Sequence, residues 1–228
     1  MASTIQLQRT ITYASSFVRY APLTLSADDP AFSNADWVRQ FILSAPFAWR
    51  WNRTVTKIQC STGQSDYKTS LPNFGWIEKA VNVDPSNGYS STELEVATVL
   101  AQENLPNLPA KISAELDDDS GNVTFRVFPS PDSAYIIYVT SQNAAPIFTA
   151  TTNTWAPIPD YLSFLYNQGF LAKTYEYMGD PRFQSAMQLF LQMLVSTSEG
   201  LSISQKNIFL TDRLNTQREQ LQLQQGKQ

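Results

Sequence analysis

The side chains that most often carry out catalysis or bind metals are scarce in this sequence. The chain of 228 residues has no histidine and a single cysteine, Cys60. It therefore cannot form a disulfide within itself, and the usual zinc ligand sets are missing. Nucleophilic catalysis that depends on a histidine base is excluded as well.

Carboxylates are the remaining candidates for acid-base or metal chemistry. The densest cluster, Asp117–Asp119, lies in the run DDDSGN, which with Asn122 loosely resembles an oxygen-ligand loop. It lacks the alternating ligands, central glycine and terminal glutamate of a calcium loop, so we interpret it as a solvated hairpin turn. Glycoside hydrolysis needs a facing pair of carboxylates, and no motif selects one from Glu93, Glu95, Glu103 and Glu115. There is no phosphate-binding or dinucleotide-binding loop. The sequence thus predicts no enzyme, no metal and no cofactor.

The composition is that of an ordinary folded protein with an acidic balance. Hydrophobic residues make up 43% and charged residues 16% of the chain, and the net charge is −4. An acidic balance argues against a protein that grips phosphate backbones, although a conduit through which DNA slides is permitted. No apolar run approaches the roughly 20 residues that cross a bilayer, and the start MASTIQLQRT lacks a secretory pattern. We expect a soluble protein made in a cytoplasm, without a membrane partner.

The elements that must position any functional surface begin with residues 155–201, the clearest helical signal. Apolar residues recur there at spacings of three and four, which indicates two amphipathic helices. Asp160 is expected near the start of the first helix and Gly179 as its left-handed C-cap. Asp180 and Pro181 are expected to begin the second helix. Gly169 is small enough to let the two backbones approach closely.

A third helix is expected from Ser33 or Asn34 to Ala45, before Pro46. We expect it to join the helix hairpin in a small bundle, whereas residues 1–25, polar and without a firm period, are expected to form an extended or partly ordered arm. The predicted bundle core consists of Trp37, Phe41, Leu162, Leu165, Phe170, Phe183, Phe190 and Leu194.

Between Thr54 and Thr149 the periodicity changes to two, which predicts short strands separated by turns. Val123, Phe125 and Val127 alternate with polar residues in the clearest hairpin, and the strand that follows is apolar on nearly both faces, so it should be central. Strands at this spacing indicate an antiparallel barrel or sandwich. The expected strands are residues 54–60, 65–71, 74–83, 93–100, 111–116, 122–128 and 134–142.

Two segments are open to more than one interpretation. The run Trp49-Arg50-Trp51 could be a cation–π stack, but we favour inner and outer alternation at the head of a strand. The glutamine-rich segment 201–228 carries loosely spaced apolar residues with too little apolar area to fold alone, so it is either disordered or orders on a partner.

Together these elements predict an α+β protein in which a large antiparallel β barrel or sandwich is inserted into a small helical bundle. The expected parts are an N-terminal arm and first bundle helix at 1–50, the β domain at 51–150, the helix hairpin at 151–200 and a C-terminal extension at 201–228.

Several strings resemble the head-to-tail adaptor (connector or neck) proteins of tailed bacteriophages, the group that includes the tail tubular protein A type. They are the helix start Pro157 to Asp160, the run Gly169-Phe-Leu-Ala172 and the corner Met178-Gly-Asp-Pro-Arg182, with weaker support from Trp-Arg-Trp-Asn at 49–52. They cover about the last third of the chain. The long β segment departs from the pattern.

The resemblance implies a structural role in the virion neck, assembled in the host cytoplasm. Such a protein forms a homo-oligomeric ring, expected to be a dodecamer, that binds the portal protein, closes the DNA-filled head and offers a surface to the tail, nozzle or another neck protein. DNA would pass through without specific binding. The C-terminal extension would then dock on the portal through Ile203, Ile208, Phe209, Leu210, Leu214 and Leu221.

An alternative from a different class is a ligand-binding β module of a phage tail that holds a carbohydrate or a host-surface ligand. Its candidate aromatic side chains are Trp49, Trp51, Trp76, Tyr67 and Tyr89. An isolated β fragment that binds glycans would favour this alternative over the adaptor.

Overall fold

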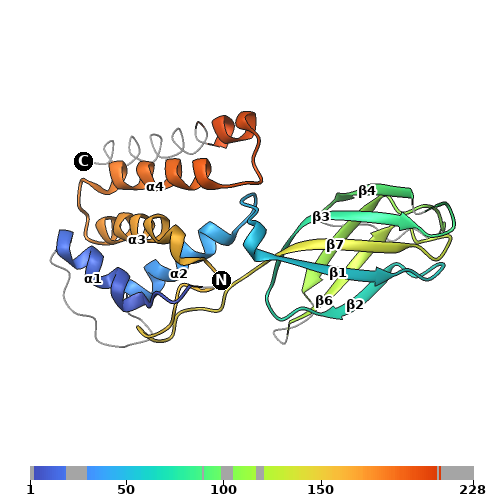
Figure 1. Cartoon of the computed structure of the whole chain (residues 1–228), viewed down its shortest axis with the longest axis horizontal. Helices are drawn as coiled ribbons and strands as arrows, with labels where there is room; N and C mark the ends of the chain where they lie inside the picture. Colours follow the sequence, from blue (N-terminus) through green and yellow to red (C-terminus); the bar gives the residue numbers. More distant parts are fainter. Residues whose placement is uncertain are drawn as a thin grey trace, which may run out of the picture. The chain divides into compact units, whose positions relative to one another are not determined.

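The computed structural model describes residues 3–18, 30–88, 90–98, 105–116, 121–209 and 211. The chain divides into two compact units, one made of residues 1–51 and 145–228 and the other of residues 52–144. The first unit is helical and the second is built of strands (Figure 1). The protein is therefore of the α+β class.

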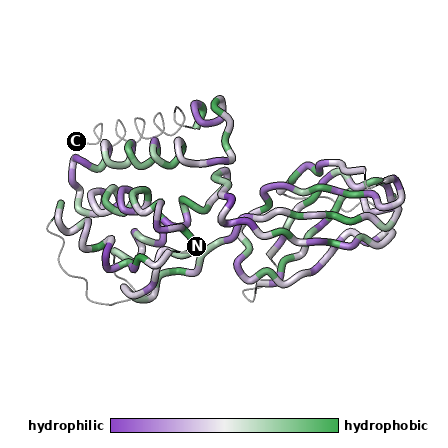
Figure 2. The backbone as a smooth tube through the Cα atoms, in the orientation of Figure 1, coloured by the Kyte–Doolittle hydropathy of each residue, from purple (hydrophilic) through white to green (hydrophobic). Residues whose placement is uncertain are grey.

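The helical unit contains α1 (Leu7–Val18), α2 (Pro30–Leu43), the short 3₁₀ helix η1 (Arg50–Asn52), which ends at the boundary, η2 (Asp160–Leu162), α3 (Ser163–Tyr177) and α4 (Phe183–Thr197). Hydrophobic positions recur along these helices (Figure 2). One hydrophobic cluster takes residues from α1, α2, α3 and α4, so these helices share a core.

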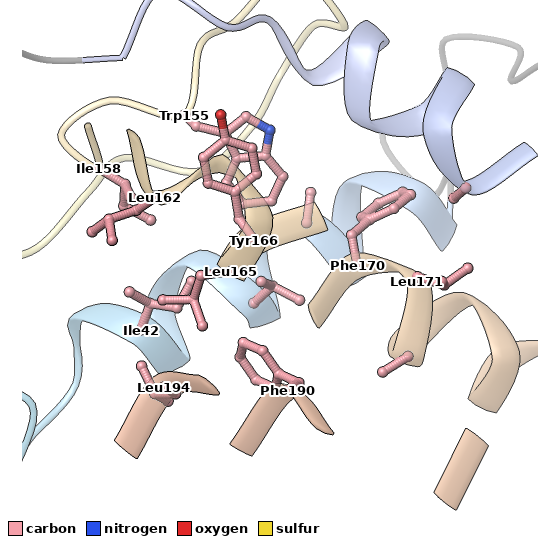
Figure 3. Packing of buried hydrophobic residues seen from close by; sticks show 14 of the residues in the cluster. Ile42, Trp155, Ile158, Leu162, Leu165, Tyr166, Phe170, Leu171, Phe190 and Leu194 are labelled. Carbon is pink, nitrogen blue, oxygen red and sulfur yellow. The ribbon is translucent and has the colours of Figure 1, made fainter. Parts of the chain in front are cut away.

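The predicted core residues divide into two groups. Leu162, Leu165, Phe170, Phe190 and Leu194 are buried, and Figure 3 shows them in the cluster with Ile42. Trp37, Phe41 and Phe183 are half-buried and pack against this cluster. Trp37 stacks on Phe41 with ring centroids 4.9 Å apart.

Gly169 lies where α2, α3 and α4 meet. A Cβ atom added there would lie 2.8 Å from both Phe190 Cε2 and Val38 Cγ1. The expectation that this glycine allows close helix approach is confirmed, because a methyl group would collide with a neighbour on each side. Gly179 has a φ of 66°, which confirms the left-handed residue predicted after α3.

The N-terminal segment corrects an expectation. Residues 7–18 form α1 rather than an extended arm, and Leu7, Ile11 and Ala14 are buried at helical spacing. Serine and threonine dominate the rest of the segment and hide this narrow apolar stripe in the sequence. The helix is stabilised by packing on the shared core rather than by intrinsic propensity.

The Trp-Arg-Trp run corrects a second expectation. Arg50–Asn52 form η1, and β1 begins only at Arg53. Trp49 and Trp51 therefore stack on one another, with centroids 5.5 Å apart, instead of alternating between the two faces of a strand. The Arg50 side chain is exposed and forms an ion pair with Glu199.

Each of the predicted strands is present in the β unit. Their bounds are β1 (Arg53–Gln59), β2 (Asp66–Ser70), β3 (Phe74–Asp84), β4 (Ser90–Val96), β5 (Lys111–Leu116), β6 (Asn122–Phe128) and β7 (Ile136–Asn143). Among the described residues they form one seven-stranded sheet in the order β1-β7-β3-β4-β5-β6-β2. The apolar strand β7 lies between β1 and β3, as expected of a central strand.

The sheet is mixed rather than wholly antiparallel. β4 and β5 are parallel, with Glu95 opposite Lys111 and Val96 opposite Ile112. β4 ends at Val96 and β5 begins at Lys111, so the two strands are far enough apart in sequence for a parallel pair, whereas the expected strand at 93–100 left only a turn before the next one. Inward side chains such as Val123, Phe125 and Ile137 form a second hydrophobic core enclosed by the curved sheet.

Candidate assembly surfaces

The C-terminal part of the helical unit begins with a capped helical segment at residues 203–209. The Ser202 amide donates to Gln205 Oε1 at 2.9 Å, and the Gln205 amide donates to Ser202 Oγ at 3.3 Å. This reciprocal pair is a capping box, which satisfies amide groups that a helix start leaves without partners. The start of the segment is therefore encoded locally.

The same segment is fastened to the end of α4. Lys206 Nζ donates to the carbonyl oxygen of Ser198 at 2.9 Å and to that of Ser196 at 3.4 Å. The Phe209 ring meets the buried Phe47 ring edge-on, with centroids 5.1 Å apart. A cation on helix-end carbonyls and an aromatic contact both favour this placement.

The predicted portal-docking residues thus lie in different surroundings. Ile203 is 80% exposed and Ile208 is 58% exposed, while Phe209 is half-buried against the helical core. Leu210, Leu214 and Leu221 lie outside the described residues. Within residues 202–209, therefore, the two isoleucines are the apolar side chains most open to a partner.

Arg39 of α2 holds a distant part of the chain in place, a role that was not predicted from the sequence. The residue is 3% exposed, and its guanidinium donates to the carbonyl oxygens of Thr154 at 3.3 Å, Ala156 at 3.4 Å and Pro146. Burial lowers the pKa of Arg39 to about 10. One turn earlier, Asp36 accepts from the Phe148 amide at 2.8 Å, and burial raises the pKa of this carboxyl.

These contacts hold the chain where it re-enters the helical unit after the β unit. Apart from Asp36, the acceptors of Arg39 are backbone carbonyls in residues 146–156, so the side chain satisfies polar groups of a segment that contains no helix or strand. A signal was present in the sequence, since Arg39 lies between Val38 and Ile42 on the apolar side of the predicted helix.

Asp160 acts on the N-terminal segment as well as at a helix start. Its carboxylate accepts from Ser3 Oγ at 2.6 Å and from Thr4 Oγ1 at 2.7 Å, and also from the amides of Thr4 and Ile5. Hydrogen bonds from Ser3 and then Thr4 lower the pKa of Asp160 to about 2. Nearby, Trp155 stacks on Tyr166 with centroids 4.4 Å apart (Figure 3) and donates to Thr10 Oγ1 at 2.9 Å.

The carboxylates considered for catalysis are engaged in cross-strand ion pairs where the structure describes them. Glu93 pairs with Lys79, Glu95 with Lys111, and Glu115 with Arg126. Asp117–Asp119 and Glu103 lie outside the described residues. In the described part of the chain, no group of three or more histidine, cysteine, aspartate or glutamate side chains could hold a metal ion.

The aromatic residues considered for ligand binding are also used internally. Trp49 is buried and donates to the Ile42 carbonyl oxygen at 2.8 Å, and Tyr67 is buried with its hydroxyl on the Gln64 carbonyl oxygen at 2.6 Å. Trp51 packs against the helical core, Trp76 is half-buried, and Tyr89 lies outside the described residues. Trp49 and Tyr67 therefore offer no ring face to a ligand.

The β domain is inserted into a helical unit, and the described reactive side chains take part in packing and ion pairs. This arrangement is expected of a structural adaptor. A family model described as SU10 adaptor protein matches residues 11–215. The chain therefore belongs to the SU10 adaptor protein family and is a head-to-tail adaptor of a phage. The match covers the β unit as well as the helices, so the long β segment is no departure from the family. No curated protein matches the chain significantly.

The family places the protein among phage virion structural proteins at the head-tail junction, where it associates with other head or tail proteins. The family is one of structural phage adaptors, which are not typically enzymes. No helix in the described part of the chain is both long and apolar enough to cross a membrane.

Proposed function

We propose that the protein forms a ring beneath the portal of the DNA-filled head, with a dodecamer as the expected state, and that its C-terminal extension docks each copy on the portal. The ring closes the head, offers the tail its attachment surface and surrounds the channel through which DNA leaves during ejection. The acidic net charge of −4 suits a channel wall that does not hold DNA.

One observation carries the docking part of this proposal. The segment at residues 203–209 is capped by Ser202 and Gln205 and fastened by Lys206, yet it leaves Ile203 and Ile208 largely exposed. Exposed aliphatic side chains on a fixed helical segment form a preorganised surface, which lowers the entropic cost of binding. Residues 212–228 continue the chain from this point with Leu214 and Leu221 of the predicted docking set.

The test uses portal-bearing heads from the same virus, mixed with purified full-length protein and imaged at the vertex by cryo-electron microscopy without imposed symmetry. Added ring density under the portal, with the C-terminal segment running along it, is the expected result. Bare portals with the protein left in solution would contradict the adaptor ring and favour the alternative of a ligand-binding β module.

Variants separate docking from folding. The expected non-binding proteins are a truncation after Thr211, which keeps Phe209 on Phe47, and the double variant Ile203→Ser with Ile208→Ser. The matched control is Leu105→Ser, which removes from the β unit an aliphatic side chain that is as exposed as Ile203. Portal binding that survives in both docking variants would exclude the C-terminal extension as the anchor.

A further inference from the structure

The turn between β3 and β4 contains an asparagine that is followed by a glycine. Asn87 is exposed, and Gly88 has a φ of 59°, a left-handed conformation that glycine adopts without strain. No other asparagine in the sequence is followed by a glycine. The carbon of the Asn87 side-chain amide and the backbone nitrogen of Gly88 are the two atoms that can close a five-membered ring.

The hydrogen bonds of this turn leave both reacting groups free. Asp84 Oδ1 accepts from the Ser86 amide at 2.9 Å and from Ser86 Oγ at 2.6 Å. The Asn87 carbonyl oxygen accepts from the Ser90 amide at 3.1 Å. Within the described residues, neither the Asn87 side chain nor the Gly88 amide has a hydrogen-bond partner of its own. The space beside Gly88 is also open, because an added Cβ atom would meet nothing within 4 Å.

Two other asparagines in connecting segments show how the fold can restrain such a group. Asn73 is exposed in the turn before β3, but the amide of the following Phe74 donates to the Leu71 carbonyl oxygen at 3.0 Å. Asn153 uses its side-chain oxygen to accept from the Ala150 amide at 2.8 Å. Asn73 is therefore an internal reference for Asn87, equally open to water but with its neighbouring amide engaged.

We propose that Asn87 is a site of spontaneous deamidation through a cyclic imide. The Gly88 backbone nitrogen loses its proton to a base in the solvent and forms a bond to Asn87 Cγ. The side-chain nitrogen of Asn87 takes up a proton and leaves as ammonia. Water then opens the ring at either carbonyl carbon and leaves aspartate or isoaspartate at position 87. The net reaction consumes one water and releases one ammonia, and it needs no oxidant, reductant or cofactor.

Both products change the end of the β3–β4 hairpin. Each adds a carboxylate to a turn that already contains Asp84, and isoaspartate also lengthens the backbone by one carbon atom. The strand pairs nearest the turn are Asp84 with Ser90 and Val83 with Ser91. These pairs should loosen, because the length of a hairpin loop and its type of turn set the pairing of the strands that it joins. The β unit thus changes irreversibly with age, independently of the C-terminal extension.

The experiment incubates the full-length protein in buffers of neutral and mildly alkaline pH and follows each asparagine by peptide mapping and mass spectrometry. Isoaspartate is quantified with an isoaspartyl methyltransferase. Conversion should occur at Asn87 and not at Asn73, and it should accelerate with pH because the attacking amide must lose a proton. A parallel incubation in urea measures what the fold contributes. The two rates should be of the same order, since no described hydrogen bond has to open before the ring closes.

Variants distinguish the chemistry from its structural effect. Asn87→Gln should abolish conversion at this position, because its longer side chain cannot close a five-membered ring. Freshly prepared Asn87→Asp has the new charge without the longer backbone, so amide exchange in residues 80–84 and 90–94 should be faster in the aged native protein than in this variant. The proposal is overturned if Asn87 does not convert, if Asn73 converts as fast, or if urea accelerates conversion more than about tenfold, because the folded turn would then protect the site.

Discussion

Arg39 lies over the ring of Phe148, with its guanidinium carbon 3.6 Å from the ring centroid. The arginine belongs to α2 and the phenylalanine to the segment that returns from the β unit, so this contact joins parts of the chain far apart in sequence. Asp36 completes the arrangement by accepting from the Phe148 amide at 2.8 Å. A cation, a carboxylate and a ring thus fix an irregular segment on a helix.

Replacing Arg39 with methionine should destabilise the helical unit by about 3–5 kcal/mol, the usual cost of removing one partner from a buried charged network. The carbonyl oxygens of Thr154 and Ala156 would lose a donor, and Asp36 would lose its cation. Denaturant unfolding followed by circular dichroism measures the change. Arg50→Met, at an exposed ion pair, is the control and should change the free energy of unfolding by less than about 1 kcal/mol.

Gly169→Ala should destabilise the protein by about 1 kcal/mol, although alanine is the better helix former. The new methyl group would lie 2.8 Å from Phe190 and Val38, and overpacking costs about 1–3 kcal/mol against a propensity gain of about 1 kcal/mol. Val38→Ala should recover part of the loss when the two changes are combined. A double-mutant cycle of unfolding free energies that gives no favourable coupling would contradict the close contact.

The hydrogen bonds that Asp160 accepts from Ser3, Thr4 and Ile5 should be sensitive to acid. Its folded pKa of about 2 lies below the ordinary 3.8, so its stabilising effect is complete above about pH 4 and is lost as the pH falls toward 2. Asp160→Asn should therefore be less thermally stable than the native protein at pH 6. This difference in stability should shrink as the pH falls from about 4 toward 2. Thr4→Val removes one donor and should raise the carboxyl pKa; a pKa unchanged by that variant would argue against the assigned cause.

Phe209 and Ile208 are adjacent but should have different roles. Phe209→Ala removes the ring that packs on Phe47 and should lower the free energy of unfolding by about 1–2 kcal/mol. Ile208→Ala, at an exposed position, should change it by less than about 0.5 kcal/mol but weaken portal binding. Thermal unfolding and portal pull-down on both variants separate the two effects. Normal portal binding by Ile208→Ala would remove this residue from the docking surface.

The sequence alone determined the elements with strong periodicity. The period of two in residues 122–128 and the helical period in 163–177 arise from burial of one face, and both elements are present. The left-handed Gly179 followed from local backbone sterics. The absence of histidine excluded catalysis by a histidine base. The residues of the helix start and the helix corner between Pro157 and Arg182 indicated the adaptor family.

Only the tertiary structure decided which residues meet across long sequence distances. The sequence pattern did not reveal the helix at 7–18, because its narrow apolar stripe is stabilised only by packing on the shared core. The parallel pairing of β4 with β5 is likewise a tertiary contact that the period of each strand does not predict. The hydrogen bonds of Arg39 to carbonyl oxygens in residues 146–156 and those of Asp160 with Ser3 and Thr4 are likewise contacts between distant segments. Local propensity and periodicity carry no information about such pairs, because their energies arise only when the chain is folded.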